Sequence, residues 1–89
     1  MVKQVFESKL FAALGDKTRF NILLVLMNGE QCACGLPKLV NRAQPTVSLQ
    51  LKYLTGLGLL SFRKEGKKVL YKIEDKRIIE LVKIAKRGE

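Results

Sequence analysis

The sequence predicts a mainly α-helical domain that carries one two-stranded β-hairpin, and two patterns lead to this fold class. Apolar residues recur at intervals of three and four along most of the 89-residue chain, as in helices that bury one face. Residues 59–64 and 68–73 alternate like strands on either side of Glu65-Gly66-Lys67, which is typical of a hairpin with a glycine turn. A chain of this length is expected to form one domain, residues 1–89.

About five helices are expected, over residues 2–14, 17–27, 32–40, 44–57 and 75–87. Asp16 and Asp75 can each cap the helix that follows, because a carboxylate accepts hydrogen bonds from the free N–H groups of a first turn. Pro45 fits the first turn of the fourth helix, where its missing N–H leaves no bond unmade. Pro37 lies inside the third, so that helix is expected to start nearer Cys34 or to be kinked.

The order of these elements predicts a winged helix-turn-helix. Two helices joined by a tight turn, over about 32–57, are followed by a basic hairpin, the wing, over about 59–73. The first and last helices, about 2–14 and 75–87, carry more apolar surface than a small core needs. Because a monomer of this size buries only about 60–65% of its unfolded surface, we expect these two helices to form a homodimer interface.

The positive charge is concentrated in the middle of the chain. The protein has 17 basic and 8 acidic residues, and residues 38–72 hold eight of the basic ones against Glu65 alone. Solubility does not require such clustering, so a site for a polyanion is favoured over a solvated surface. Nucleic acid is favoured over a membrane surface because the charge lies on two segments of different kinds rather than along one amphipathic helix.

Several classes of protein are excluded by what the sequence lacks. It has no histidine, no glycine loop that would cradle a phosphate and no paired carboxylates, so an enzyme is not expected. No apolar run approaches the roughly 20 residues of a membrane span, and charges interrupt the N-terminal apolar spacing of a signal peptide. Cys32 and Cys34 are too close for an unstrained disulfide in regular structure, which predicts reduced thiols and a cytoplasmic protein.

The fourth helix is predicted to read DNA. Val47, Leu51 and Leu54 share the buried face, and Leu49 points the other way, where it can contact a thymine methyl group or be an ordinary surface leucine. Glutamine side chains can reach adenine edges, hydroxyl groups suit phosphates, and the lysines and arginine supply charge. The candidate DNA-binding residues are Gln44, Pro45, Thr46, Ser48, Leu49, Gln50, Lys52, Tyr53, Arg63, Lys64, Lys67 and Lys68.

Three segments in this order and spacing carry a family resemblance: Ala13-Leu14-Gly15-Asp16-Lys17-Thr18-Arg19 with Ile22-Leu23, Ala43-Gln44-Pro45-Thr46-Val47-Ser48 with Leu51-Lys52-Tyr53-Leu54, and Leu57-Gly58-Leu59-Leu60 with Arg63-Lys64-Glu65-Gly66-Lys67 and Tyr71. They resemble the second helix, recognition helix and wing of the ArsR/SmtB family of small repressors. The resemblance covers about residues 5–75. It implies a dimeric winged-helix repressor that binds double-stranded DNA at a two-fold operator and releases it when an effector binds.

The chain departs from this family at two places in the recognition helix. Leucine and glutamine, Leu49-Gln50, stand where the family usually carries a polar or basic residue, which affects the expected sequence preference. Ala43 replaces the more usual serine cap, which is expected to weaken the helix start by about 1 kcal/mol.

Cys32-Ala33-Cys34 is similar to the Cys-X-Cys metal box of the arsenic- and cadmium-sensing members of the family. Thiolates favour soft ions such as As(III), Sb(III), Cd(II) or Hg(II). On a helix the two side chains point about 200° apart, so binding one ion through both is expected to unwind that turn and to shift the recognition helix. The box is incomplete, since Gly35 and Pro37 replace an acidic residue and a third cysteine; an external thiol or a group on the first helix is expected as the third ligand.

The family's second metal site, on the last helix, is not expected here. Glu74, Asp75 and Glu80 have no histidine beside them. Two other roles stay open for Cys32 and Cys34, a thiol redox sensor and ordinary packing residues.

Measurements of DNA binding distinguish three hypotheses for the function of the chain. A sequence-specific repressor predicts a steep loss of affinity with salt and half-sites about one helical turn apart. Equal affinity for all duplexes favours a non-specific architectural protein. No affinity at low salt favours a winged helix that binds another protein.

Overall fold

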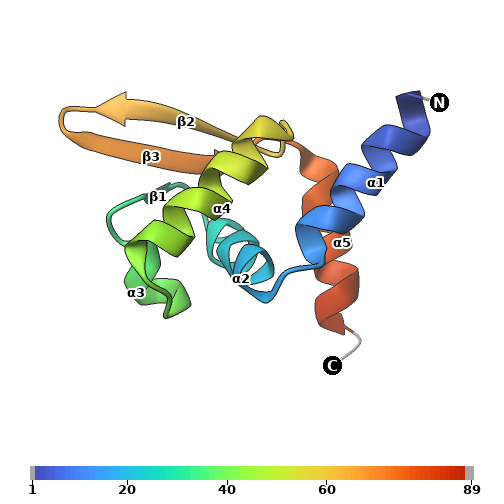
Figure 1. Ribbon diagram of the computed structural model, residues 1–89, viewed down its shortest axis with the longest axis horizontal. Helices are drawn as coiled ribbons and strands as arrows, with labels where there is room; N and C mark the ends of the chain where they lie inside the picture. Colours follow the sequence, from blue (N-terminus) through green and yellow to red (C-terminus); the bar gives the residue numbers. More distant parts are fainter. Residues whose placement is uncertain (1, 88–89) are drawn as a thin grey trace.

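The computed structural model describes residues 2–87, with side chains over 8–86, and has five helices and three strands. This confirms the mainly helical winged helix-turn-helix (Figure 1). In chain order the elements are α1 (Val2–Leu14), α2 (Lys17–Leu26), β1 (Gln31–Cys32), α3 (Leu36–Val40), α4 (Gln44–Gly56), β2 (Leu60–Glu65), β3 (Lys68–Ile73) and α5 (Lys76–Arg87). No helix among the described residues is long and apolar enough to cross a membrane.

The helix starts follow the predicted capping pattern. Asp16 Oδ1 accepts hydrogen bonds from the backbone N–H groups of Thr18, at 2.7 Å, and Arg19, at 3.2 Å, so it caps α2. Asp75 Oδ1 accepts one from Arg77 N at 3.0 Å in the first turn of α5. Ala43 stands at the N-cap of α4, and its side chain makes no capping bond.

The third helix is shorter than predicted, and the difference moves both cysteines out of it. α3 begins at Leu36, with Gly35 at its N-cap and Pro37 in its first turn, because proline lacks the N–H that a later turn would need. Gln31 and Cys32 form β1 instead and pair with Tyr71 and Leu70 of β3. The prediction of helix over 32–35 was therefore wrong.

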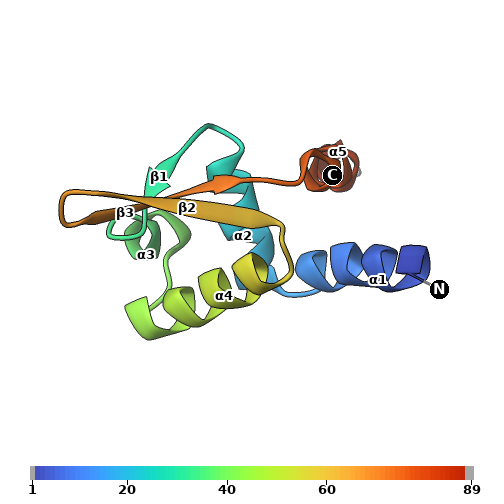
Figure 2. The same cartoon turned by 90° about the horizontal axis from the view of Figure 1, so that it is seen from above.

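The wing is a long antiparallel hairpin. β2 and β3 pair from Leu60 opposite Ile73 to Glu65 opposite Lys68. The turn between them contains Gly66 at φ +63°, a left-handed conformation that glycine adopts without strain. Leu60 is buried at the base, and the hairpin projects to one side of the helices (Figures 1 and 2).

The core surrounds α2 and holds α4 in place. Ile22 and Leu23 of α2 are fully buried together with Leu54 of α4 and with Ile78 and Val82 of α5. Figures 1 and 2 place α1 and α5 at the end of the molecule opposite the tip of the wing. The core thus joins α4 and the wing to an end formed by two helices.

Candidate nucleic-acid interface

The exposed face of α4 is the first part of the site. Val47, Leu51 and Leu54 are buried, at 1%, 3% and 0% exposure, and fix the helix by its inner face. Leu49 is 63% exposed, which confirms that it points to the outer face of the helix. The other predicted residues on this outer face are also exposed, namely Gln44, Pro45, Thr46, Ser48 and Lys52.

The tip of the wing is the second part. Lys64, Lys67 and Lys68 are all exposed. Lys67 and Lys68 line one depression of the surface together with Gln44 and Ser48 of α4. Two of the predicted helix contacts and two of the predicted wing contacts therefore border one depression at the N-terminal half of α4.

Arg63 differs from the other cations of the wing because it is paired with acidic residues. Its Nε and Nη2 donate to the two carboxylate oxygens of Glu30, each at 2.9 Å, and its Nη1 donates to Glu65 at 2.7 Å. These hydrogen bonds hold the pKa of the Glu30 carboxyl below its ordinary value and raise the pKa of the Arg63 guanidinium. Arg63 thus ties the wing to the loop before β1, and its charge is compensated.

The remaining cations of the basic segment form no close ion pair with another described side chain, although the charge of Lys72 also lowers the pKa of Glu30. Among the side chains that the structure describes, none of the other seven basic residues of 38–72 forms an ion pair. They are Lys38, Arg42, Lys52, Lys64, Lys67, Lys68 and Lys72. Unpaired surface cations suit a phosphate backbone, since binding it releases counterions.

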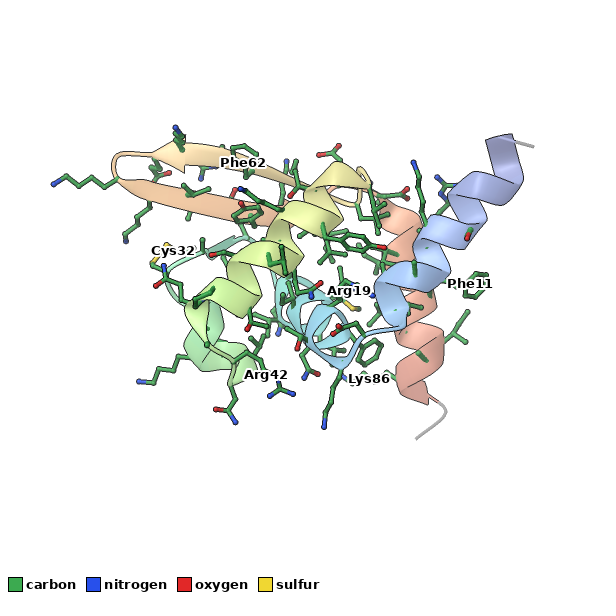
Figure 3. All side chains as sticks on the ribbon, in the orientation of Figure 1. Phe11, Arg19, Cys32, Arg42, Phe62 and Lys86 are labelled. Carbon is green, nitrogen blue, oxygen red and sulfur yellow. A yellow bond between two sulfur atoms is a disulfide. The ribbon has the colours of Figure 1, made fainter. Side chains whose placement is uncertain are left out.

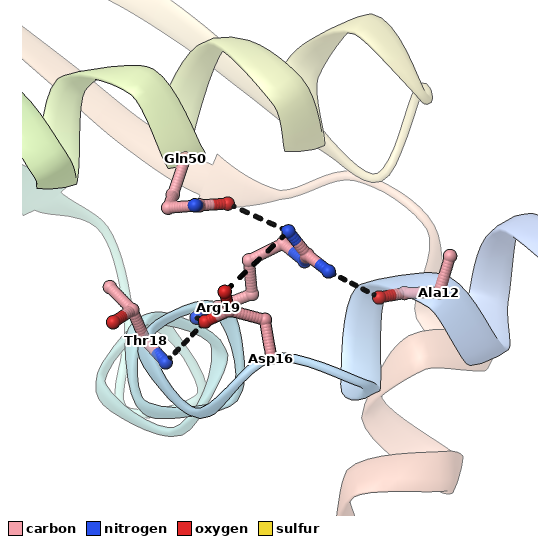
Figure 4. A network of polar contacts seen from close by, with 5 residues as sticks. All are labelled: Ala12, Asp16, Thr18, Arg19 and Gln50. Carbon is pink, nitrogen blue, oxygen red and sulfur yellow. Dashed lines mark hydrogen bonds and ion pairs between the residues drawn. The ribbon is translucent and has the colours of Figure 1, made fainter.

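Two predicted DNA contacts have partners inside the protein, as Figure 4 shows in part. Gln50 Oε1 accepts a hydrogen bond from Arg19 Nη1 at 3.0 Å, and the Arg19 guanidinium carbon lies 4.6 Å from the centre of the Tyr53 ring. No role was predicted for Arg19 from the sequence, because 31 residues separate it from Gln50. Its place in the family motif was the only signal.

Cys32 and Cys34 form a disulfide bond, which corrects the prediction of reduced thiols. The prediction that the two side chains point apart is also wrong, because the cysteines lie in a strand and turn rather than in a helix. The turn brings their Cα atoms to 5.2 Å. Both cysteines line the depression that Gln44 and Ser48 border, so the pair adjoins the reading helix.

The described residues fit a soft ion only in part. In the reduced protein this turn would supply two thiols side by side, but no group of three or more His, Cys, Asp or Glu occurs within the described part of the chain. Lys67 and Lys68, which share the depression, carry the wrong charge for a cation. Figure 3 places Cys32 far from Phe11 of α1, so this chain's own α1, over its described side chains, does not provide the third ligand.

Comparisons with known proteins agree with this geometry. The pattern that defines the bacterial regulatory proteins of the ArsR family matches residues 16–61. A cadmium resistance transcriptional regulatory protein CadC homolog of Staphylococcus aureus is 39% identical over 79 residues, which are 88% of this chain and 65% of that protein. An uncharacterized HTH-type transcriptional regulator of Methanocaldococcus jannaschii is 38% identical over 85 residues, 94% of this chain and 96% of that one.

One solved structure carries the same fold as a dimer. The homodimeric winged helix-turn-helix DNA-binding domain of a possible ArsR-family regulator from Mycobacterium bovis superposes with a TM-score of 0.86 at 23% identity. The match covers 98% of this chain and 81% of that one.

Proposed function

The chain belongs to the ArsR family of bacterial regulatory proteins, and from this premise we propose that it is a homodimeric repressor that binds a two-fold DNA operator. This is a family of regulatory proteins, which confirms the prediction that the chain is not an enzyme. The observation that carries the proposal is the depression that Gln44 and Ser48 of α4 share with Lys67 and Lys68 of the wing. A cytoplasmic location, where a bacterial regulator meets DNA, is part of the proposal.

The roles of the DNA-binding residues follow from their chemistry. The side chain of Gln44 suits an adenine edge, and exposed Leu49 suits a thymine methyl group in the major groove. Thr46, Ser48 and Lys52, together with the wing lysines Lys64, Lys67 and Lys68, suit phosphate oxygens. The carbonyl oxygen of Gln50 and the charge of Arg63 are used within the protein, so neither group is assigned a DNA contact.

The homodimer is proposed to form through α1 and α5. Phe11 of α1 and Ile84 of α5 are 65% and 61% exposed, and Phe11 lines an apolar groove with Leu10 and Leu81. Burying such side chains supplies the hydrophobic stabilisation that a small domain lacks alone. A two-fold axis through this end would present two copies of α4 to half-sites about one helical turn apart.

We propose that the reduced cysteine pair binds the effector, a soft ion such as As(III), Sb(III) or Cd(II). Paired thiolates favour such ions, and the cadmium-resistance relative supports this choice. Cys32 and Cys34 would supply two ligands, and an external thiol would supply the third. Occupying this turn alters the depression between α4 and the wing, which weakens DNA binding if the ion favours the altered state.

The disulfide itself favours a second mode of regulation. Oxidation joins Cys32 to Cys34, and reduction frees both thiols, in the same turn beside α4. A redox-responsive regulator would then need no metal. The two modes differ in which state of the cysteines changes the affinity for DNA.

The DNA-binding proposal is tested by selecting preferred duplexes from a random library and measuring their affinity by fluorescence anisotropy against salt. Affinity should fall steeply with salt, and Lys67→Gln with Lys68→Gln should reduce the log–log slope by about two if both contact phosphates. Lys17→Gln is the control for the loss of a charge, because Lys17 is exposed on α2, outside the proposed DNA and dimer surfaces, and its loss should leave the slope unchanged. Equal affinity for selected and random duplexes would instead support an architectural protein. The absence of binding at low salt would support a protein-interaction module.

The effector proposal is tested on the reduced protein by titration with As(III) and with Cd(II), followed by thiolate-to-metal absorbance. Stoichiometric binding that is lost in Cys32→Ser and in Cys34→Ser, together with weaker operator binding, is the expected result. If neither ion binds at micromolar concentration, the metal mode is refuted. Operator affinity measured with oxidised and reduced wild-type protein then decides the redox mode.

A further inference from the structure

We infer that Arg19 is a positioning residue that fixes the recognition helix α4 relative to α1. This inference rests on the proposed DNA-binding function, because it explains how the reading helix keeps its orientation. Neither the family match nor the sequence pattern gives Arg19 a role of its own.

The guanidinium group of Arg19, which projects from α2, contacts α1, α4 and the N-cap residue of α2 itself (Figure 4). Nη1 donates to Gln50 Oε1 of α4 at 3.0 Å, and Nη2 donates to the Ala12 carbonyl oxygen of α1 at 2.9 Å. Nη1 also lies 3.8 Å from the carboxylate of Asp16, the N-cap of α2. The side chain is only 18% exposed, so these contacts are largely shielded from water.

The partners suit a planar, charged donor. Ala12 lies in the last turn of α1, where the helix dipole attracts a cation, and its carbonyl oxygen accepts from Arg19 beside the backbone N–H of Gly15 at 3.1 Å. On α4, the guanidinium lies 4.6 Å from the centre of the Tyr53 ring, within the range of a cation–π contact. A guanidinium fixes the directions of its donors in one plane, which a lysine ammonium does not.

The consequence for DNA reading is geometric. To pair with adenine through both of its amide atoms, Gln50 would use Oε1 as an acceptor, and Arg19 already donates to that oxygen from within the protein. Gln50 therefore serves as the attachment point of α4. Because α1 is part of the proposed dimer interface, Arg19 links the orientation of α4 to the arrangement of the two subunits.

The test uses the selected operator and four variants of the full chain: Arg19→Lys, Gln50→Leu, the double variant, and Lys17→Arg as the control. Lys17 is exposed in the same turn of α2, so its exchange keeps the charge and should leave affinity unchanged. Arg19→Lys also keeps the charge but loses the planar donor pair. We expect it to lower operator affinity about tenfold, the size of one hydrogen bond to a charged group, with unchanged salt slope and dimer affinity.

The double variant separates positioning from direct base contact. If Gln50 acts through Arg19, then Gln50→Leu lowers affinity by a similar factor alone but adds little to Arg19→Lys. If Gln50 reads a base, it adds its full factor and relaxes specificity at one position, which would overturn the inference. Operator affinity of wild-type strength in Arg19→Lys would overturn it as well.

A measurement without DNA keeps this inference separate from the proposed function. The protein has two tyrosines and no tryptophan, so the Tyr71→Phe protein has Tyr53 as its only tyrosine. Adding Arg19→Lys should change the fluorescence of Tyr53, because the cation over its ring is moved, whereas Lys17→Arg should not. If wild-type protein binds no duplex, the proposed function fails, and an unchanged Tyr53 signal would refute the Arg19 contact independently.

Discussion

The N-cap of α4 offers a stability change that can be worked out from the structure. Ala43 has extended backbone angles, φ −64° and ψ 148°, and its side chain makes no capping bond. In α2, by comparison, Asp16 accepts two backbone N–H groups. A serine at position 43 has only Thr46 N–H to bind, because the other usual donor belongs to Pro45, which has none.

One capping bond sets the expected size of the effect. Serine in place of alanine at an N-cap is worth about 1 kcal/mol, and in a domain of this size about 1 kcal/mol raises Tm by roughly 4–8 °C. Circular dichroism melting of Ala43→Ser at fixed protein concentration measures this shift. Ala85→Ser is the matched control, since the same exchange at an exposed position within α5 should lower Tm slightly.

An acidic N-cap at position 43 should change thermal stability and DNA affinity in opposite directions. Ala43→Asp should raise Tm at least as much as Ala43→Ser, because a carboxylate both caps the helix and interacts favourably with its N-terminal dipole. It should also weaken operator binding, because it places a negative charge beside the start of α4, which is proposed to face DNA phosphates. Unchanged Tm in both variants would refute the capping argument, and unchanged DNA affinity in Ala43→Asp would refute the placement of this helix end on DNA.

Four further predictions address the core, the exposed face of α4, the apolar groove at Phe11 and the wing. Leu54→Ala should lower the free energy of unfolding by about 2–5 kcal/mol in urea titrations, because Leu54 is fully buried. Leu49→Ala should leave Tm unchanged but reduce the preference for thymine at one operator position, as competition with substituted duplexes would reveal. Phe11→Glu should shift sedimentation toward the monomer. Because the pKa of Glu30 is lowered by Arg63, its pairing is complete above the ordinary pKa of a glutamate and is lost as pH falls through the lowered value. The hydrogen-exchange protection factors of the wing amides, corrected for the intrinsic rate at each pH, should fall there, and Glu30→Gln should show the lower protection already at neutral pH.

The sequence predicted those elements whose structure depends on local patterns. The inward spacing of Val47, Leu51 and Leu54 fixed the faces of α4, and Gly66 marked the turn of the wing. Capping by Asp16 was predictable for the same reason, since its partners are two and three residues away.

The errors concern contacts between distant parts of the chain. β1 exists because the edge of β3 offers backbone partners to Gln31 and Cys32, which no periodicity in 31–32 reveals. That pairing prevents the helix start expected there and brings the two cysteines together. The pairs of Arg19 with Gln50 and of Arg63 with Glu30 likewise span more than 30 residues, so the sequence could not show that Gln50 and Arg63 have partners within the protein.

These long-range contacts hold α4 at two places along its length. Its N-terminal half borders the cysteine turn and Lys67 and Lys68, whereas Gln50 and Tyr53, further along, are held by Arg19 against the end of α1. A change at the cysteine turn can therefore act on the reading half of α4 while the attachment to α1 stays in place. Conversely, a change at Arg19 alters the attachment of α4 to α1 and leaves the cysteine turn in place. An effector at Cys32 and Cys34 should therefore still change operator affinity in Arg19→Lys protein, and by the same factor as in wild type if the two ends of the helix act independently.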